Sequence, residues 1–322
     1  MTGRGEAATA GAVPAPPARF ARDVLLVARF ELAEALRSRL LVVMVLLFVG
    51  AGAIGAWGYT ELLGRIEEQA ARATGAPVAR RPGAVIRRIR DTRSYRDLLR
   101  LFLGSEQKAD YFAAIPPMVV FFAWVSFGFT PWLVLFTSAE TIASEVGNRA
   151  IRYSVLRTGR LEFALGKMAG QGLIVVGVTA LSAVTFMGIA AASLEGFEGW
   201  ATLRGLLSYW PRVLLFTLPF LGWAMFSSML SASANRARVI SLGGGVLLAA
   251  VGGLVAHPPR WLRGGPAFES ARDLFGYLTP FQHDQGLFYP PGGAFAADLT
   301  VCLALTVLYF TLGYAALRRR DL

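Results

Sequence analysis

The charged segment 140–171 holds the residues best suited to chemistry or recognition. It carries eight charged residues and separates two long apolar runs. Its last part, GRLEFALGKM, resembles a phosphate-binding loop, in which four residues separate a Gly from Gly-Lys-Ser/Thr. Here six residues separate Gly159 from Gly166, and Met168 stands where the magnesium-binding hydroxyl is needed. The segment is therefore not expected to bind a nucleotide.

Histidine and cysteine are too scarce for a catalytic or metal site. The chain has two histidines, His257 and His283, and a Ser–His pair requires an imidazole beside the nucleophile. His283 and Asp284 alone supply too few ligands for a metal ion, and the single Cys302 cannot form a disulfide within one chain. We therefore expect no enzymatic activity, no catalytic residue, no metal and no cofactor on this chain.

The composition is that of a membrane protein. Hydrophobic residues make up 55% of the 322 residues, charged residues 16%, and the mean hydropathy is +0.50, whereas about a quarter of a soluble domain is charged. The net charge of +11 does not require nucleic acid, because cytoplasmic ends of membrane helices collect Lys and Arg. We therefore expect no nucleic-acid partner.

Six apolar runs are long enough, or nearly so, to cross a hydrocarbon core, which takes about 20 helical residues. They lack the alternation of a membrane barrel. The sequence therefore predicts an all-α polytopic membrane protein. The predicted spans are residues 40–59, 115–138, 168–194, 213–231, 239–256 and 298–317.

Two segments precede the first span. Residues 1–19, rich in Ala, Pro and Gly, predict a disordered tail, and residues 20–322 are expected to form one membrane domain. Within it, FARDVLLVARFELAEALRSR predicts an amphipathic helix lying in the membrane interface against lipid. A cytosolic extension of the first span is the alternative. The apolar face of this helix contains Val24, Leu25, Ala28, Leu32 and Leu36.

The distribution of basic residues predicts that both termini are cytoplasmic. This orientation makes residues 60–114 an external loop, with two amphipathic helices joined around Pro77 and Pro82. That loop holds eleven basic residues, but long loops contribute little to the charge bias. Outside it, sixteen basic residues fall on the cytoplasmic side and five on the other.

The cores of the predicted spans contain no Asp, Glu, Lys or Arg. Ion-coupled carriers commonly keep ionisable groups near the middle of the membrane, so a carrier of this kind is disfavoured. Hydroxyls such as Ser126, Thr130 and Ser182 leave cation binding open.

The segment 140–167 is expected to form one or two short cytoplasmic helices. An ordinary solvated loop is the alternative, but a connector of this length with helical patterning is better explained as a docking surface for a partner. Its apolar contacts are predicted to come from Ile142, Val146, Ile151, Val155 and Leu156.

Several motifs appear in an order that resembles one family. Glu145-Val146-Gly147, the stretch YSVLRTGR and Leu165-Gly166-Lys167 follow one another between the second and third spans. ARFELAEALRSR lies before the first span, YLTPFQHDQGLF before the last, and RRRDL at the end of the chain. The set resembles the membrane subunits of ABC-2 type exporters, although Thr158 stands where that family usually has Pro.

The resemblance implies a function that depends on other chains. Two such permeases, identical or related, would stand in a bacterial inner membrane on two ATP-binding cassette subunits, which hold the ATP and magnesium. Segment 140–167 would then be the coupling helix that docks on the ATPase, with Arg157 and Arg160 pairing with its acids. The implied coupling residues are Glu145, Gly147, Arg157, Arg160, Gly166 and Lys167.

Two other functions remain open. In the first, the chain is a channel or ion-coupled carrier and segment 140–167 is regulatory. In the second, it is an envelope-assembly scaffold that moves no cargo and recruits a periplasmic protein through residues 60–114. The cargo of a transporter is not revealed, since spans without charge suit drugs, lipids or peptides.

Overall fold

A computed structural model describes residues 17–74, 81–84, 92–195, 197–258 and 266–320. All regular elements among these residues are helices, and six of them are long and apolar enough to cross a membrane. The predicted fold class is therefore confirmed. Most of the predicted tail, residues 1–16, lies outside the described residues, while helix α1 (Pro17–Arg37) already includes the tail's last three positions.

The six long helices match the six predicted spans in order. One large difference is at the start of α10, because Pro211 and Pro219 lie inside this helix and do not end it. Arg204 and Arg212 also lower the hydropathy of its first turns, which made them look like a loop. The spans are α2 (Arg39–Thr74), α6 (Pro117–Thr137), α9 (Arg160–Ser193), α10 (Gly199–Leu230), α11 (Ala234–Ala256) and α14 (Phe295–Arg318).

The region 60–114 differs from the prediction. Its first amphipathic stretch is not a separate helix, because α2 continues without a break to Thr74. The second predicted helix is partly represented by α4 (Arg93–Leu103), while residues 85–91 lie outside the described residues. A further short helix, α5 (Glu106–Ala113), leads into α6.

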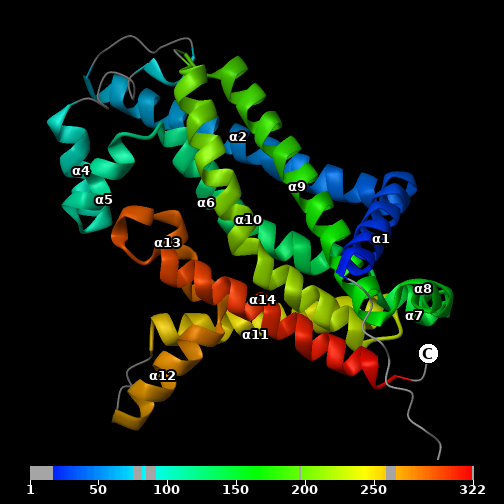
Figure 1. Ribbon diagram of the computed structural model, residues 1–322. Helices are drawn as coiled ribbons and strands as arrows, with labels where there is room; N and C mark the ends of the chain where they lie inside the picture. The colour runs from blue at the N-terminus through cyan, green and yellow to red at the C-terminus, as the bar shows by residue number, and fades with distance from the viewer. Residues whose placement is uncertain (1–16, 75–80, 85–91, 196, 259–265, 321–322) are drawn as a thin grey trace, which may run out of the picture.

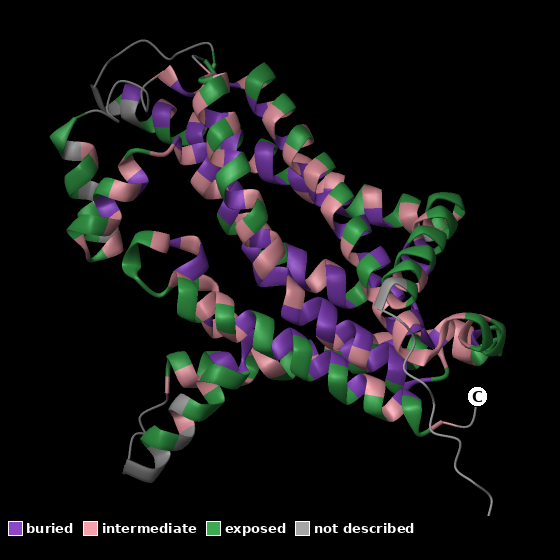
Figure 2. Ribbon diagram, viewed as in Figure 1, coloured by how far each residue is buried: buried purple, intermediate pink, exposed green. Residues whose placement is uncertain are grey.

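The buried core is centred on α10, which packs against α6, α9, α11 and α14. Its side chains Tyr209, Phe216 and Phe220 are almost completely buried. Figure 2 shows this burial along the middle of the bundle and exposed residues on the outer faces of the helices.

The short elements gather at two opposite ends of the bundle (Figure 1). At one end lie α1, α7 (Ala143–Gly147), α8 (Ile151–Thr158) and the end of α14. At the other lie α4, α5 and α13 (Asp284–Phe288), while α12 (Pro266–Leu278) extends away from the spans. Four of the described segments predicted to be cytoplasmic, α1, α7, α8 and the end of α14, therefore lie on one side.

Candidate functional site

The segment between α6 and α9 folds into the two short helices α7 and α8, as one of the sequence interpretations predicted. Ile142 and Ile151 are buried and fix the segment to the bundle. Arg149, with a φ of 60°, lies in the left-handed region between the two helices. Gly159, with a φ of 85°, allows the sharp change of direction from α8 to α9 directly after Thr158.

Two contacts fix α7 to the neighbouring spans. The Ser228 hydroxyl on α10 accepts hydrogen bonds from the backbone N–H groups of Ile142 and Ala143, both at 2.9 Å. These donors belong to the first turn of α7, where helix N–H groups lack partners within the helix. Arg238 on α11 forms an ion pair with Glu140, just before α7.

A buried ion cluster joins α7, α9 and α1. The Lys167 ammonium, on α9, forms ion pairs with Glu145 on α7 and with Glu31 on α1. Only 3% of the Lys167 surface is exposed, and Glu31 is buried as well. Gln171, one turn further along α9, donates to the second Glu31 oxygen at 2.8 Å and accepts from the Ser138 hydroxyl at 3.3 Å. One lysine thus holds three chain segments together.

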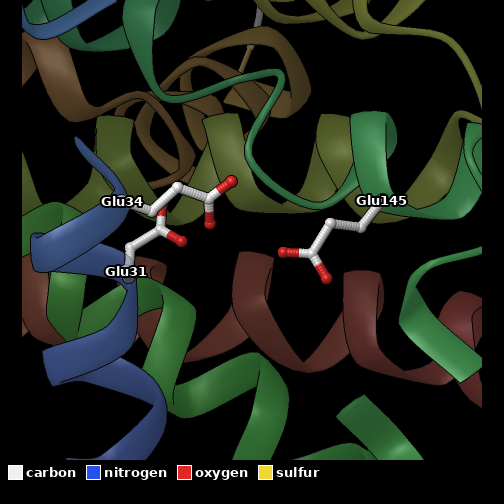
Figure 3. Close-up of side chains that lie close together, drawn as sticks. All are labelled: Glu31, Glu34 and Glu145. Atoms are coloured by element: carbon white, nitrogen blue, oxygen red, sulfur yellow. The ribbon is translucent and has the colours of Figure 1, made fainter. Parts of the chain in front are cut away.

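The carboxylates in this cluster outnumber the single ammonium, and Glu34 adds a third carboxylate. Oxygens of Glu31, Glu34 and Glu145 lie within 4.8 Å of one another, and Figure 3 shows the Glu145 side chain extending toward the two glutamates of α1. Burial raises the pKa of Glu145, the nearby carboxylates of Glu31 and Glu34 raise it further, and Lys167 opposes the shift. Since the ammonium already supplies positive charge to two of these carboxylates, we interpret the cluster as an ion network and not as a metal centre.

Glycines bring α1 into direct contact with α9. A Cβ atom added to Gly166 would lie 2.5 Å from the Val27 Cβ and 2.9 Å from the Val24 carbonyl oxygen. A Cβ on Gly170 would lie 2.7 Å from the Glu31 Cβ. Small residues of this kind allow close helix contact within membranes. Here the contact brings Glu31 within reach of Lys167.

The other predicted coupling residues have different environments. Gly147 lies against α10's end, where an added Cβ would be 2.6 Å from the Ala232 carbonyl oxygen. Arg157 is exposed on α8. Arg160 instead donates to the carbonyl oxygens of Arg318 at 2.6 Å and Arg320 at 3.2 Å. Its guanidinium therefore contacts the end of α14, and the expected pairing of Arg160 with a partner's acids stays a prediction.

The hydroxyls considered for cation binding line two small cavities among the spans. Ser126, Thr130 and Ser182 line both, and each cavity has a volume of about 20 Å³, which is room for about one water. None of the lining residues carries a charge.

A comparison with protein families identifies the family to which the chain belongs. The family model described as ABC-2 family transporter protein matches residues 25–322. The protein belongs to the ABC-2 transporter family. With six apolar spans, it is a multi-pass membrane protein of a transport family, and membership implies association with an ATP-binding cassette subunit. A comparison with curated proteins found no match.

Within this ABC-2 fold, sequence reasoning missed Glu31 and Gln171. The predicted apolar face of α1 included Leu25 and Leu36, which are exposed, whereas the buried face consists of Val27, Ala28 and Glu31. An acid on the buried face of an amphipathic helix requires a positive partner. That requirement alone does not select Lys167, since the chain has 32 Lys and Arg residues.

Ser228→Ala tests the attachment of α7 to α10. The variant leaves two backbone N–H groups at the start of α7 without their acceptor, so we expect a loss of roughly 1–2 kcal/mol in the stability of this helix. Hydrogen exchange at residues 142 and 143 should become faster. Ser227→Ala is a suitable control, since the Ser227 hydroxyl donates to Trp223 within α10. Equal exchange rates in both variants would contradict the capping role.

Proposed function

We propose that this protein is the membrane-spanning permease subunit of an ATP-driven ABC-2 exporter. A separate ATP-binding cassette subunit, which carries the ATP and magnesium, docks on α8. Two permeases, identical or related, form the pathway in a bacterial inner membrane, with both termini in the cytoplasm. The observation that carries the proposal is the exposed face of α8.

This face combines apolar and basic side chains. Tyr153 and Leu156 are 78% and 84% exposed, and both lie on the same side of the helix, since residues three apart are neighbours there. Arg149, Arg152 and Arg157 are exposed around them. α8 is neither long nor apolar enough to be a span, so these apolar residues do not face lipid inside the membrane core. An apolar centre with a charged rim is typical of a protein interface.

The contacts of α7 and α8 support a mechanical role. A force on α8 reaches α9 through Gly159, and a force on α7 reaches α9 and α1 through Lys167. Ser228 and Arg238 connect the same segment to α10 and α11. A movement of this segment on docking is therefore transmitted to α1, α9, α10 and α11 together. Coupling between two sites requires such a shared element.

The arrangement of the ends supports the proposed orientation. Arg160 contacts the end of α14, Arg320 donates to the Ser231 carbonyl at 3.1 Å, and Arg238 pairs with Glu140. These basic residues all come from segments predicted to be cytoplasmic. Recruitment of a periplasmic protein by residues 60–114 stays a prediction.

The docking role is tested with the double variant Leu156→Asp, Arg157→Glu. It is co-expressed with the ATP-binding cassette subunit that co-purifies with the unchanged protein, and the affinity of the purified pair is measured together with ATP-driven transport. We expect at least a roughly 30-fold loss of affinity, as for central interface residues. Transport should fall with it.

The matched control is Leu101→Asp, which changes an equally exposed leucine, 83% exposed, on α4 at the opposite end. Its affinity for the ATPase should equal that of the unchanged protein. Unchanged ATPase affinity in the α8 variant would sink the docking assignment.

A further inference from the structure

A large cavity lies far from the ion cluster, at the end of the bundle that holds α4, α5 and α13. Its volume is about 610 Å³, within the range of about 300–1,000 Å³ that is usual for pockets enclosing one small molecule. The walls come from α5, the middle of α6, α10 and the segment from Phe281 to Tyr289. None of the coupling residues lines it.

The lining is strongly apolar with one polar region. Nine of the fifteen lining residues are aromatic, among them Trp124, Phe127 and Phe288. Lys108, Asp284 and Gln285 are the polar residues. A pocket of this composition fits a ligand with a long apolar body and one polar head.

The charge of the polar region is set by Lys108. Among the described residues Lys108 forms no ion pair, and its ammonium lies 5.7 Å from the centre of the Tyr289 ring. Glu106, on the same helix, is paired with Arg100 instead. Asp284 lines the same region, and burial raises its pKa. The polar region is therefore suited to a negative head group.

Two residues that line the cavity are also exposed on the outside of a span. Trp124 and Phe129, both on α6, line the cavity and are 67% and 58% exposed. Both lie within the membrane-spanning helix, so the opening lies at the depth of the membrane. An amphiphile dissolved in a leaflet could enter here without crossing water.

We propose that this cavity binds a single-chain anionic amphiphile, such as a fatty acid, with its chain against the aromatic walls and its head group on Lys108. The volume favours one chain over the two chains of a phospholipid. A cationic head group would meet an unpaired ammonium. This inference deepens the proposed export function by naming a substrate class, and only the fate of the ligand, not its binding, rests on that function.

The test uses the full-length protein in phosphatidylcholine nanodiscs and palmitate with a diazirine in its chain. Irradiation should label peptides of α6 and the segment 281–289, and unlabelled palmitate should compete. Lys108→Gln should weaken palmitate binding by roughly tenfold, the loss expected for one hydrogen bond to a charged group. Lys108→Arg keeps the charge and should bind within about threefold of the unchanged protein.

A second variant fills the cavity without changing charge. A Cβ on Gly128, which lines the cavity, would have no heavy atom within 4 Å, so Gly128→Leu can place its side chain in the open space and should reduce labelling. Gly243→Leu is the control, since Gly243 on α11 also has open space around it and lies outside the cavity. It should label normally.

Three results would overturn the proposal. These are equal labelling of the unchanged protein, Lys108→Gln and Gly128→Leu, stronger competition by hexadecyltrimethylammonium than by palmitate, and stronger competition by dipalmitoyl phosphatidic acid. The assay contains no ATPase. Failure here therefore leaves the docking of α8 intact, and failure of docking leaves this site intact.

Discussion

Lys167→Met is expected to lower the free energy of unfolding by about 3–5 kcal/mol, the usual cost of removing one partner from a buried ion pair. The variant leaves the buried Glu31 and the half-buried Glu145 without a positive charge. Methionine keeps the length of the side chain, so lost packing contributes little. Unfolding in mixed micelles of increasing dodecyl sulfate at pH 7 measures the effect.

The charge explanation has two controls. The triple variant Glu31→Gln, Glu145→Gln, Lys167→Met removes the ammonium and the two carboxylates paired with it, and should recover most of the lost stability, because neutral replacements of a buried ion network are often tolerated. Lys108→Met changes the other lysine of the chain, which forms no ion pair among the described residues, and should alter stability by less than about 0.5 kcal/mol. A triple variant as unstable as Lys167→Met would contradict the explanation.

The loss in the free energy of unfolding caused by Lys167→Met, its stability deficit, should also depend on pH. Burial already raises the pKa of Glu145 in the unchanged protein, and the loss of Lys167 removes the charge that opposes this shift. A group with a raised folded-state pKa stabilises fully below its unfolded pKa, and this contribution is lost as pH rises through the folded pKa. The deficit should therefore shrink between pH 7 and pH 5. A constant deficit would indicate lost packing.

The number, order and helical class of the spans could be predicted because hydrophobic length is a local property. About 20 apolar residues in a row must form backbone hydrogen bonds within the segment once they are in lipid. The positions of the helix ends were harder to predict. α2 and α10 extend beyond their apolar parts, through residues such as Glu61 and Arg204 that hydropathy excludes but helix formation tolerates.

The candidate site was only partly predictable, because its partners come from distant parts of the chain. Glu145 and Lys167 could be selected as a charged pair in one segment. Glu31 lies 136 residues before Lys167, and no spacing rule connects them. Arg160 shows a different difficulty. Its residue type and position suggested docking on a partner, but in the structure its guanidinium contacts the end of α14. Such contacts can be predicted only when the packing of the helices is known.

The role of Glu31 changes how coupling is understood. A buried ion pair is weak evidence for stability, because desolvation offsets much of the attraction. The ion pair nevertheless restricts the positions of its helices strongly, since an ammonium shared by two carboxylates must remain within hydrogen-bond distance of both. The cluster therefore requires α1, α7 and α9 to move together. This requirement makes the contact between α1 and α9 as important as the docking face itself.

Gly166→Val is accordingly expected to lower the free energy of unfolding by about 1–3 kcal/mol, as overpacking does, and to uncouple ATP hydrolysis from transport. The added Cβ would lie 2.5 Å from the Val27 Cβ, so α1 must move away from α9 and draw Glu31 away from Lys167. Binding of the ATPase should persist, because α8 is unchanged. Unfolding, ATPase binding and ATP-driven transport are measured on the same preparation.

Gly177→Val provides the matched control on the same helix. An added Cβ there would meet no heavy atom within 4 Å, so this variant carries the same change in helix propensity without the contact with α1. Its transport should equal that of the unchanged protein. Val27→Ala, combined with Gly166→Val, removes one of the three nearest obstructing atoms, the Val27 Cγ1, and leaves the Val27 Cβ and the Val24 carbonyl oxygen. This double variant should restore transport only in part. If Gly166→Val and Gly177→Val transport equally well, α1 does not need to stay on α9, and the ion cluster serves stability alone.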